Sequence, residues 1–286
     1  MKTLYVTDLD GTLLNSNREV SKNTIDGLNK LIDQGILFTV ATARTPATVV
    51  PLLDKININL PVIVMNGSFI YDIQQSKYIY TSQIPYKSVK KIVGIVEERK
   101  KQIFIYTLKH DMLTVYHKGF NSKEEEKFCS ERSELKLKKF INVESYNLES
   151  EDRVGHMVMI DTYEVIKEIM ELVKKIDSVH PVMYRDVNTE NSYLLEIAPA
   201  QTNKGKGIEK LVDKFGINNV VAFGDNLNDK EMLEMADCSC VVENGEETIK
   251  SCADYIIESN DQHGVVKFIN SHFSKDYLDS NTSINF

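Results

Sequence analysis

The sequence predicts an α/β protein whose doubly wound, parallel-sheet (Rossmann-like) core is interrupted by an inserted α+β domain. Short apolar runs alternate with amphipathic segments over the first part of the chain, as in a parallel sheet covered by helices. Paired strand patterns typical of hairpins then replace this alternation, and it returns after Ala198-Pro199. We therefore expect a discontinuous core of residues 1–83 and 190–286 and an inserted domain of residues 84–189.

The amino-terminal elements follow from local sequence signals. Ser21 precedes apolar residues at helical spacing and is predicted to cap a helix that ends at Gly35. Pro46 suits the first turn of a second helix, which is expected to run to about Ile56. The predicted strands of this part are residues 4–7, 36–41 and 61–65.

The middle and the end of the chain differ in pattern. The densely charged stretch 121–139 is predicted as a solvated helix and loop, and residues 274–286 are polar and expected to fray. The other predicted elements between residues 68 and 197 are strands 68–72, 78–82, 103–107, 113–117, 154–160, 182–185 and 193–197, with helices 85–101 and 163–176. After the insert, helices 205–214, 230–236 and 246–252 alternate with strands 220–223, 238–242 and 255–257.

Composition excludes several classes of protein. Apolar content of 42% and charged content of 27% are those of a soluble globular protein. The net charge is −8 without a long basic block, so no nucleic-acid partner is expected. No apolar run approaches the length of a membrane span or of a signal-peptide core, so no membrane partner is expected. The four cysteines lack metal-type and C-x-x-C spacing, which favours reduced thiols in the cytoplasm. We expect a monomer or a weak dimer.

Two carboxylates follow the first predicted strand. Asp8 and Asp10 are one residue apart, and Gly11 then breaks the apolar run. Carboxylates this close titrate as a coupled pair unless a cation separates them, and ligands of open parallel sheets bind at such strand ends. A plain polar turn is the alternative. An EF-hand calcium loop is excluded, because Gly11 is the fourth residue of the motif instead of the sixth and Leu13 follows.

A third carboxylate has a matching position. Asp225 stands just past the apolar run 220–223, as Asp8 does on its own strand, so neighbouring parallel strands would bring the two together. Acidic oxygens without His or Cys partners suit Mg²⁺. The alternative is that residues 225–229 only cap a helix. Likewise, Thr42 at a strand end could be a helix cap, and Lys204 could be one of many surface lysines.

Taken together, these residues resemble the four motifs of the haloacid dehalogenase-like hydrolases. The motifs are Asp8-Leu9-Asp10-Gly11-Thr12, Thr42, Lys204 before Gly205, and Gly224-Asp225-x-x-Asn228-Asp229. The insert resembles the cap domain of the Cof-type subfamily (type IIB), so the resemblance covers essentially the whole chain. It implies a Mg²⁺-dependent phosphatase that hydrolyses a small-molecule phosphate monoester, such as a sugar phosphate, through an aspartyl-phosphate.

The resemblance also implies a role for each motif residue. Asp8 would be the nucleophile, and Asp10 the general acid that protonates the leaving alkoxide and then the base that activates water. Mg²⁺ would bind the carboxylates of Asp8 and Asp225 and the backbone carbonyl of Asp10, while Asp229 would position Lys204 or a metal-bound water. The phosphate group would be bound by the N–H groups of Leu9 and Ala43, the hydroxyl of Thr42, the ammonium of Lys204 and the amide of Asn228.

Some questions stay open on the sequence alone. Close relatives usually carry Gly-Arg where this chain has Ala43-Arg44, so a requirement for positive φ would not be met there. Five residues could face the leaving group of the substrate or serve the fold: Arg44, Asn66, Tyr184, Arg185 and Glu196. A phosphomutase acting on a sugar phosphate and a non-enzymatic phosphometabolite-binding regulator remain alternatives.

Three other classes do not fit. A true dehalogenase has no use for Asp10 or for bound Mg²⁺, and a P-type pump needs transmembrane helices. A P-loop protein needs G-x-x-x-x-G-K-[ST], which residues 204–207 do not satisfy.

Overall fold

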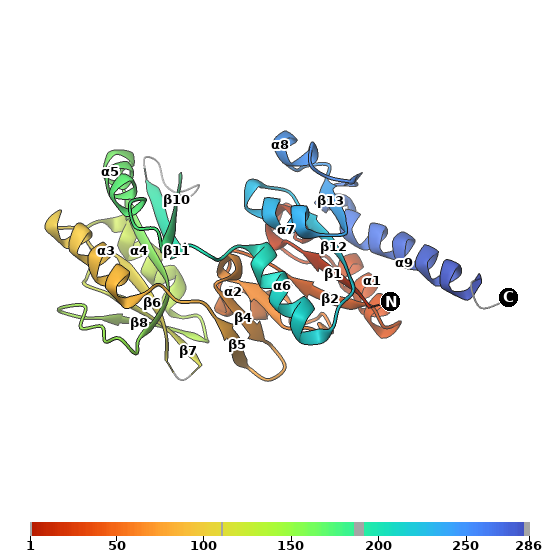
Figure 1. Cartoon of the computed structure of the whole chain (residues 1–286), viewed down its shortest axis with the longest axis horizontal. Coiled ribbons are helices and arrows are strands. Elements are labelled where there is room, and N and C mark those ends of the chain that lie inside the picture. Colours follow the sequence, from red (N-terminus) through yellow and green to blue (C-terminus); the bar gives the residue numbers. More distant parts are fainter. Residues whose placement is uncertain (1, 110, 186–191, 283–286) are drawn as a thin grey trace. The chain divides into compact units, whose positions relative to one another are not determined.

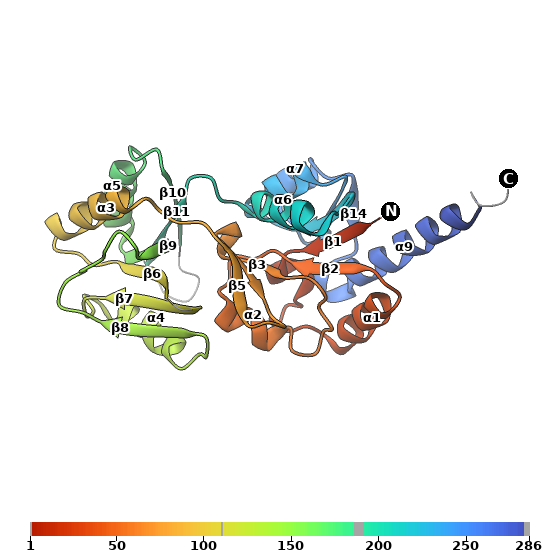
Figure 2. The ribbon, with the colours of Figure 1, turned by 60° about the horizontal axis from the view of Figure 1, so that its bottom comes forward.

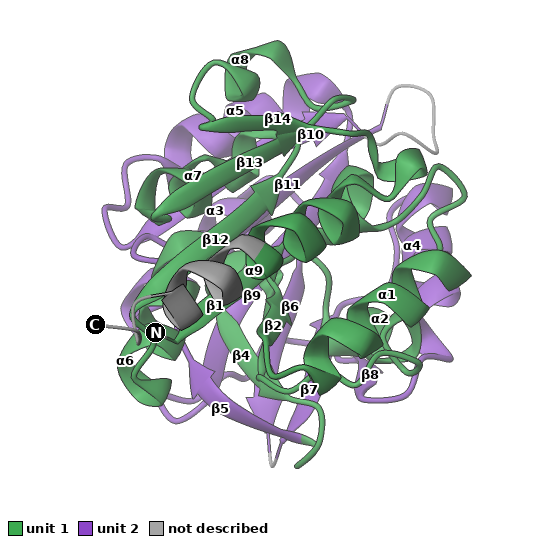
Figure 3. Cartoon of the chain, turned by 90° about the vertical axis from the view of Figure 1, so that its right-hand side faces the viewer, with its two compact units in different colours: residues 1–76, 203–286 green, residues 77–202 purple. Residues whose placement is uncertain are grey.

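The computed structural model describes residues 2–109, 111–185 and 192–282, with the backbone alone for 275–282. The chain divides into two compact units, coloured separately in Figure 3. Unit 1 comprises Met1–Ser76 and Asn203–Phe286, and unit 2 comprises Lys77–Thr202.

The central sheet of unit 1 contains β1 (Thr3–Thr7), β2 (Leu37–Val40), β12 (Asn219–Gly224), β13 (Cys238–Val242) and β14 (Tyr255–Ile257). All of its pairings are parallel, in the order β14-β13-β12-β1-β2, of which Figure 1 labels β13, β12, β1 and β2. β1, β2, β12 and β13 are buried over most of their length, as expected for a parallel sheet that is covered on both faces, whereas the edge strand β14 is mostly exposed.

The helices of unit 1 are α1 (Lys22–Asp33), α2 (Pro46–Leu52), α6 (Lys204–Phe215), α7 (Lys230–Met235), α8 (Glu247–Lys250) and α9 (Gly264–Thr282). Figure 2 shows α6 and α7 on one side of the sheet and α1 and α9 on the other, and each of these pairs is in contact. The Ser21 side chain caps α1 by accepting a hydrogen bond from Thr24 N–H, as the sequence predicts.

The third predicted strand differs from its expected place. β3 (Val62–Val64) pairs antiparallel with β4 (Phe69–Asp72), in a small sheet of order β3-β4-β5 that ends with β5 (Lys77–Thr81). Only one parallel bridge, from Ala41 to Ile63, links β3 to the end of β2. The tight turn after β3 reverses the chain direction, so the next strand, β4, pairs as a hairpin with one edge of β3.

Unit 2 has a six-stranded sheet in the order β10-β11-β9-β6-β7-β8. Its strands are β6 (Phe104–Lys109), β7 (Met112–His117), β8 (Lys138–Asn142), β9 (Arg153–Asp161), β10 (Val179–Arg185) and β11 (Tyr193–Pro199). All pairings are antiparallel except the parallel pair β7 and β8. Apolar side chains of α3 (Tyr86–Glu98) and α5 (Tyr163–Val173) pack on this sheet to form its core.

The predicted fold class, an α/β core with an inserted α+β part, is confirmed. Three local predictions were wrong. In the charged stretch 121–139 the predicted helix is confirmed as α4 (Lys123–Ser133), but the predicted loop also contains the first residues of β8. The helix from Pro46 ends at Leu52, earlier than Ile56. Residues 274–282 continue helix α9 where fraying was expected, and residues 283–286 lie outside the described part. Within the described ranges, no helix is long and apolar enough to cross a membrane.

Candidate active site

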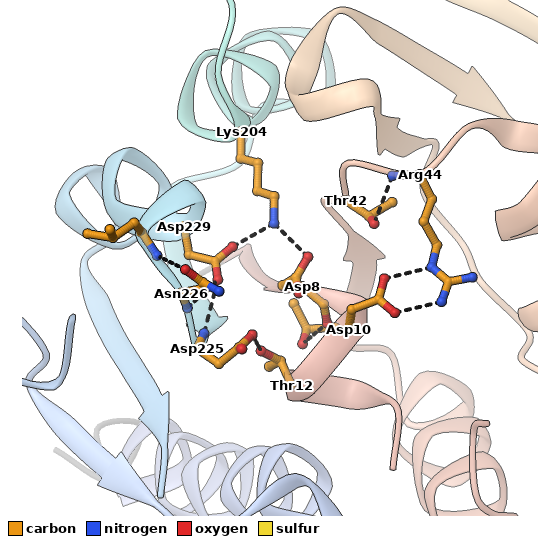
Figure 4. Close-up of polar contacts among 11 residues, drawn as sticks. Asp8, Asp10, Thr12, Thr42, Arg44, Lys204, Asp225, Asn226 and Asp229 are labelled. Carbon is orange, nitrogen blue, oxygen red and sulfur yellow. Dashed lines mark hydrogen bonds and ion pairs between the residues drawn. The ribbon is translucent and has the colours of Figure 1, made fainter. Parts of the chain in front are cut away.

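Every motif residue lies in unit 1, at the carboxyl ends of its strands or at the start of α6. β1 pairs in parallel with β2 on one side and with β12 on the other. Asp8 therefore emerges between Thr42, which follows β2, and Asp225, which follows β12. Lys204 enters from the first turn of α6 (Figure 4). The arrangement is the one that ligand sites of open parallel sheets use.

Lys204 is fully buried, so it is not a surface lysine. Its Nζ donates to Asp8 Oδ1 at 2.5 Å and to Asp229 Oδ1 at 2.6 Å. Burial by itself would lower the pKa of Lys204, but the two carboxylates outweigh it and hold the pKa above its usual value. Lys204 is therefore a permanent cation between two acidic side chains.

Asp229 holds both Lys204 and the loop after β12. Its second oxygen, Oδ2, accepts hydrogen bonds from the backbone N–H groups of Asp225 (3.0 Å) and Asn226 (3.1 Å). Asn226 and Asp229 form a capping box at the short helical turn Leu227–Asp229, so the predicted capping alternative also holds for this segment. Because both Asp229 oxygens are engaged, Asp229 positions its neighbours and is poorly placed to bind a metal.

Asp225 and Asp8 bring carboxylate oxygens together. One oxygen from each of Asp8, Asp225 and Asp229 lies within 4.8 Å of the other two. Thr12 Oγ1 donates to Asp225 Oδ1 at 2.6 Å, which orients that carboxylate. Within the described part of the chain, the side-chain hydrogen bonds of Asp8 and Asp225 are made by Oδ1 in each case. This donor set of hard oxygens fits a Mg²⁺ ion.

Both candidate metal-binding carboxylates have raised pKa values. Burial raises the pKa of Asp8 to about 7, against the opposing effect of Lys204. Burial also raises the pKa of Asp225 to about 6, although the hydrogen bond from Thr12 partly opposes it. A buried carboxylate that favours its proton is relieved by a divalent cation, because the cation stabilises the charged form.

Asp10 turns away from Asp8 and forms an ion pair with Arg44. The guanidinium donates from Nε and Nη2 to the two oxygens of Asp10, both at 2.6 Å. This bidentate contact raises the pKa of Arg44, and the Asp10 side chain stays half exposed. Sequence reasoning left Arg44 open and missed this pairing, as it missed the contact between Thr12 and Asp225. Neither carries a local signal, because each joins segments far apart in the chain.

The remaining predicted phosphate-binding residues lie around the same strand ends. Thr42 is 1% exposed, and its Oγ1 accepts a hydrogen bond from Arg44 N–H at 3.2 Å. Thr45, and not Thr42, is the N-cap residue of α2, so the capping alternative for Thr42 was wrong. Leu9 is buried at the start of a π-helical turn, and Asn228 is exposed in the turn after β12.

Ala43 causes no backbone strain where relatives have glycine. It is exposed, and it is absent from the described residues with positive φ. Its N–H therefore remains usable without the conformational freedom of glycine.

The other residues left open by the sequence fall into both units. Asn66 N–H donates to Thr42 O at 3.0 Å, so Asn66 borders the site. In unit 2, the Tyr184 hydroxyl donates to Glu196 Oε1, and Arg185 is exposed at the end of β10.

Comparison with known proteins identifies the family. The sequence profile of the haloacid dehalogenase-like hydrolases matches residues 5–269, nearly the whole chain. The protein therefore belongs to the haloacid dehalogenase-like hydrolases. It is an enzyme of this family, and its curated relatives include proteins named as phosphatases.

Two of these relatives are from Bacillus subtilis. The chain is 26% identical to the 5-amino-6-(5-phospho-D-ribitylamino)uracil phosphatase YitU over 95% of this chain and 97% of that protein. It is 27% identical to the phosphatase of the same name, YwtE, over 97% and 100% of the two chains. A solved haloacid dehalogenase-like hydrolase from Bacteroides thetaiotaomicron has the same fold, with a TM-score of 0.77, 22% identity and coverage of 95% and 99%.

Proposed function

We propose that this enzyme is a Mg²⁺-dependent phosphatase that hydrolyses a small-molecule phosphate monoester through an aspartyl-phosphate on Asp8. One observation carries the proposal. Asp8 is a buried carboxylate whose Oδ1 is fixed by Lys204, and one of its oxygens lies within 4.8 Å of a carboxylate oxygen of Asp225. A nucleophile held in one orientation next to a permanent cation is what in-line attack on phosphorus requires.

The residues divide the chemistry among themselves. Asp8 attacks phosphorus and forms the acyl phosphate, while Lys204 offers its positive charge to the phosphoryl oxygens. Thr42 and the N–H groups of Leu9 and Ala43 donate hydrogen bonds to the same oxygens, and the Asn228 amide adds another donor. Asp10 protonates the leaving oxygen and later takes the proton of the attacking water, which requires it to leave Arg44.

The metal would be held by the carboxylates of Asp8 and Asp225 and the backbone carbonyl of Asp10. Bound there, it supplies positive charge that reduces the repulsion between the carboxylates and the incoming phosphate. Asp229 keeps Lys204 and the Asp225 loop in place without binding the ion itself.

The proposed substrate is a sugar phosphate or a similar metabolite, and the proposed cap, residues 84–189, selects it and excludes water from the acyl phosphate. The phosphoribityl substrate named for the two relatives supports a polyol phosphate. If a chain lacking residues 84–189 kept the same rates and the same ranking of esters, this role of the cap would be wrong. Free thiols at Cys129, Cys240 and Cys252 support a cytoplasmic location.

The decisive experiment measures inorganic phosphate released from a panel of phosphate monoesters, with Mg²⁺ and with a chelator. We expect release that depends on Mg²⁺ and stops in Asp8→Asn, and a phosphoryl group on Asp8 in mass spectra of acid-quenched wild-type protein. Phosphate release that survives Asp8→Asn would contradict the mechanism. A sugar phosphate that isomerises without phosphate release would favour the phosphomutase alternative, and binding without turnover would favour the regulator.

A further inference from the structure

The loop after β3 has an unusual backbone. Met65, Asn66 and Gly67 all adopt positive φ, of 51°, 50° and 88°. Glycine tolerates this left-handed region, but consecutive L-residues rarely adopt it. Such a conformation persists only where the surrounding structure holds it, and it is concentrated at functional sites.

The loop is fixed between two segments of the candidate site. Met65 N–H donates to Arg44 O and Asn66 N–H donates to Thr42 O, both at 3.0 Å. On the other side, a Cβ at Gly67 would lie 2.1 Å from the carbonyl oxygen of Asn203, the residue before Lys204. The strained turn thus lies next to the end of β2 and near the start of α6.

Three side-chain oxygens on these adjoining loops lack partners. Thr45 Oγ1, Asn66 Oδ1 and Ser68 Oγ are all buried, and none has a hydrogen-bond partner among the described residues. Thr45 occupies the N-cap position of α2, yet its hydroxyl caps nothing. Because buried polar atoms in folded proteins are nearly always paired, three unpaired atoms on these adjoining loops indicate a missing partner.

We propose that Asn66 and Thr45 form a subsite that binds a hydroxyl or amino group carried by the substrate near its phosphate. This inference rests on the proposed phosphatase function and specifies its substrate class. An amide oxygen only accepts hydrogen bonds, so the group that pairs with Asn66 Oδ1 must be a donor. Oxygens of an ionised phosphate cannot serve, which assigns the subsite to the leaving group. A polyol, sugar or amino-alcohol phosphate has such a donor beside the ester oxygen.

The experiment compares matched esters that differ in one donor. The hydroxyl arm uses 2-hydroxypropyl phosphate against propyl phosphate, and the amino arm uses ethanolamine phosphate against ethyl phosphate. A site built to bind a substrate donor discriminates strongly against the analogue that lacks it. For wild-type enzyme with Mg²⁺ we expect kcat/KM to favour the donor-bearing ester in one arm by at least about tenfold.

Asn66→Gly should bring that ratio close to one, mainly through a higher KM for the donor-bearing ester. Glycine accepts the left-handed backbone, so this variant removes the amide without adding strain. Thr45→Val, which keeps the side-chain shape and removes the hydroxyl, should lower the same ratio. Ser76→Gly replaces another residue with positive φ (51°), away from these loops, and should keep the wild-type ratio.

Three results would overturn the subsite. Wild-type enzyme could show no preference in either arm, or Asn66→Gly could keep the full preference while its unfolding temperature changes, as a purely structural role predicts. Wild-type enzyme that releases phosphate neither from these esters nor from the panel of monoesters would overturn the proposed function itself, and the subsite with it.

Discussion

At the scale of single residues, Lys204 decides the charge balance of the site. Its ammonium is fully buried and paired with Asp8 and Asp229, two carboxylates that would otherwise repel each other. A buried ion pair adds little net stability, but removing one of its partners is strongly destabilising because the other charge is left uncompensated. Lys204 therefore serves stability and the proposed reaction through the same contacts.

We expect Lys204→Met to lower kcat/KM by at least about 10²-fold, since an electrostatic stabiliser of the transition state is lost. The free energy of unfolding at neutral pH should fall by about 3–5 kcal/mol. Burial already raises the pKa of Asp8 to about 7, and without the lysine this folded-state pKa would rise further, so stability is kept at low pH and lost as pH rises. Urea unfolding between about pH 4 and 8 measures this.

Lys206→Met is the matched control for Lys204→Met. Lys206 lies on the exposed side of the same helix and pairs with Glu209 at 2.7 Å. An exposed pair of this kind contributes little, so the control should keep activity and stability. Equal stability of Lys204→Met and Lys206→Met at neutral pH would contradict the charge balance described above.

Gly11 provides a second prediction at the residue scale. Its φ is +83°, and a Cβ there would lie 2.4 Å from Asp225 Oδ2. We expect Gly11→Ala to displace the candidate metal-binding carboxylate and to lower kcat/KM by about 10²-fold. Gly35→Ala introduces similar strain (φ +98°) where nothing lies within 4 Å. Both variants should lose about 1–2 kcal/mol of stability, but only Gly11→Ala should lose activity and Mg²⁺ affinity.

At the scale of elements, the sequence predicts best what apolar runs and turn residues encode. β1 and β12 are short and apolar, and their parallel pairing brings Asp8 and Asp225 to one edge, as expected. The pair of Asp10 and Arg44 could not be predicted, because it depends on where two loops meet in space. β8 was missed for another reason: it begins with two lysines, which local patterns assign to a solvated loop.

Lys138 in β8 is the unusual member of that strand. It is only 4% exposed, and burial lowers its pKa to about 8, with repulsion from Arg132 adding to the effect. In the unfolded chain a lysine titrates near 10.5, so the folded state binds fewer protons between about pH 8 and 10.5. The free energy of unfolding should therefore rise with pH across that window. At pH values below the window, the buried charge of Lys138 destabilises the fold in full.

Lys138→Met should therefore raise the free energy of unfolding at neutral pH, by at most about 3 kcal/mol, and abolish the rise at alkaline pH. Its exposed neighbour provides the control, Lys139→Met, which should change stability by less than about 0.5 kcal/mol. Denaturant unfolding from about pH 7 to 10 measures both. Lower stability of Lys138→Met at neutral pH would mean that the cation–π contact of Lys138 with Phe140, at 5.3 Å, outweighs desolvation.

At the scale of the whole molecule, the two units differ in what they contain. The predicted nucleophile, metal-binding and phosphate-binding residues all belong to unit 1, which is assembled from both ends of the chain. Unit 2 holds none of them. The two-part organisation was predictable, because a change of strand pattern is visible in one sequence. The substrate was not, since no sequence motif encodes a leaving group. Contacts between separate strands, such as the hydrogen bond from Tyr184 to Glu196, have no local sequence signal either.

This separation predicts where Mg²⁺ acts. Metal ions bind deprotonated carboxylates, and the pKa values of Asp8 and Asp225 are raised to about 7 and about 6, first by burial. Because their pKa values are raised in the folded state, these two groups stabilise the metal-free fold at low pH. That stabilisation is lost as pH rises through 6 and 7. Mg²⁺ should reverse that loss, so its stabilising effect should be large at about pH 8 and small at about pH 5.

Thermal unfolding with and without Mg²⁺ at the two pH values measures this effect, and hydrogen exchange at about pH 8 locates it. At a metal concentration about 100 times Kd the gain should approach about 2.7 kcal/mol. New protection should appear near Asp8 and Asp225 in unit 1 and be absent from unit 2. Asp225→Asn should lose most of the response, because an amide offers no charge to the ion. Equal protection of both units, or a response independent of pH, would place the metal elsewhere than between these two carboxylates.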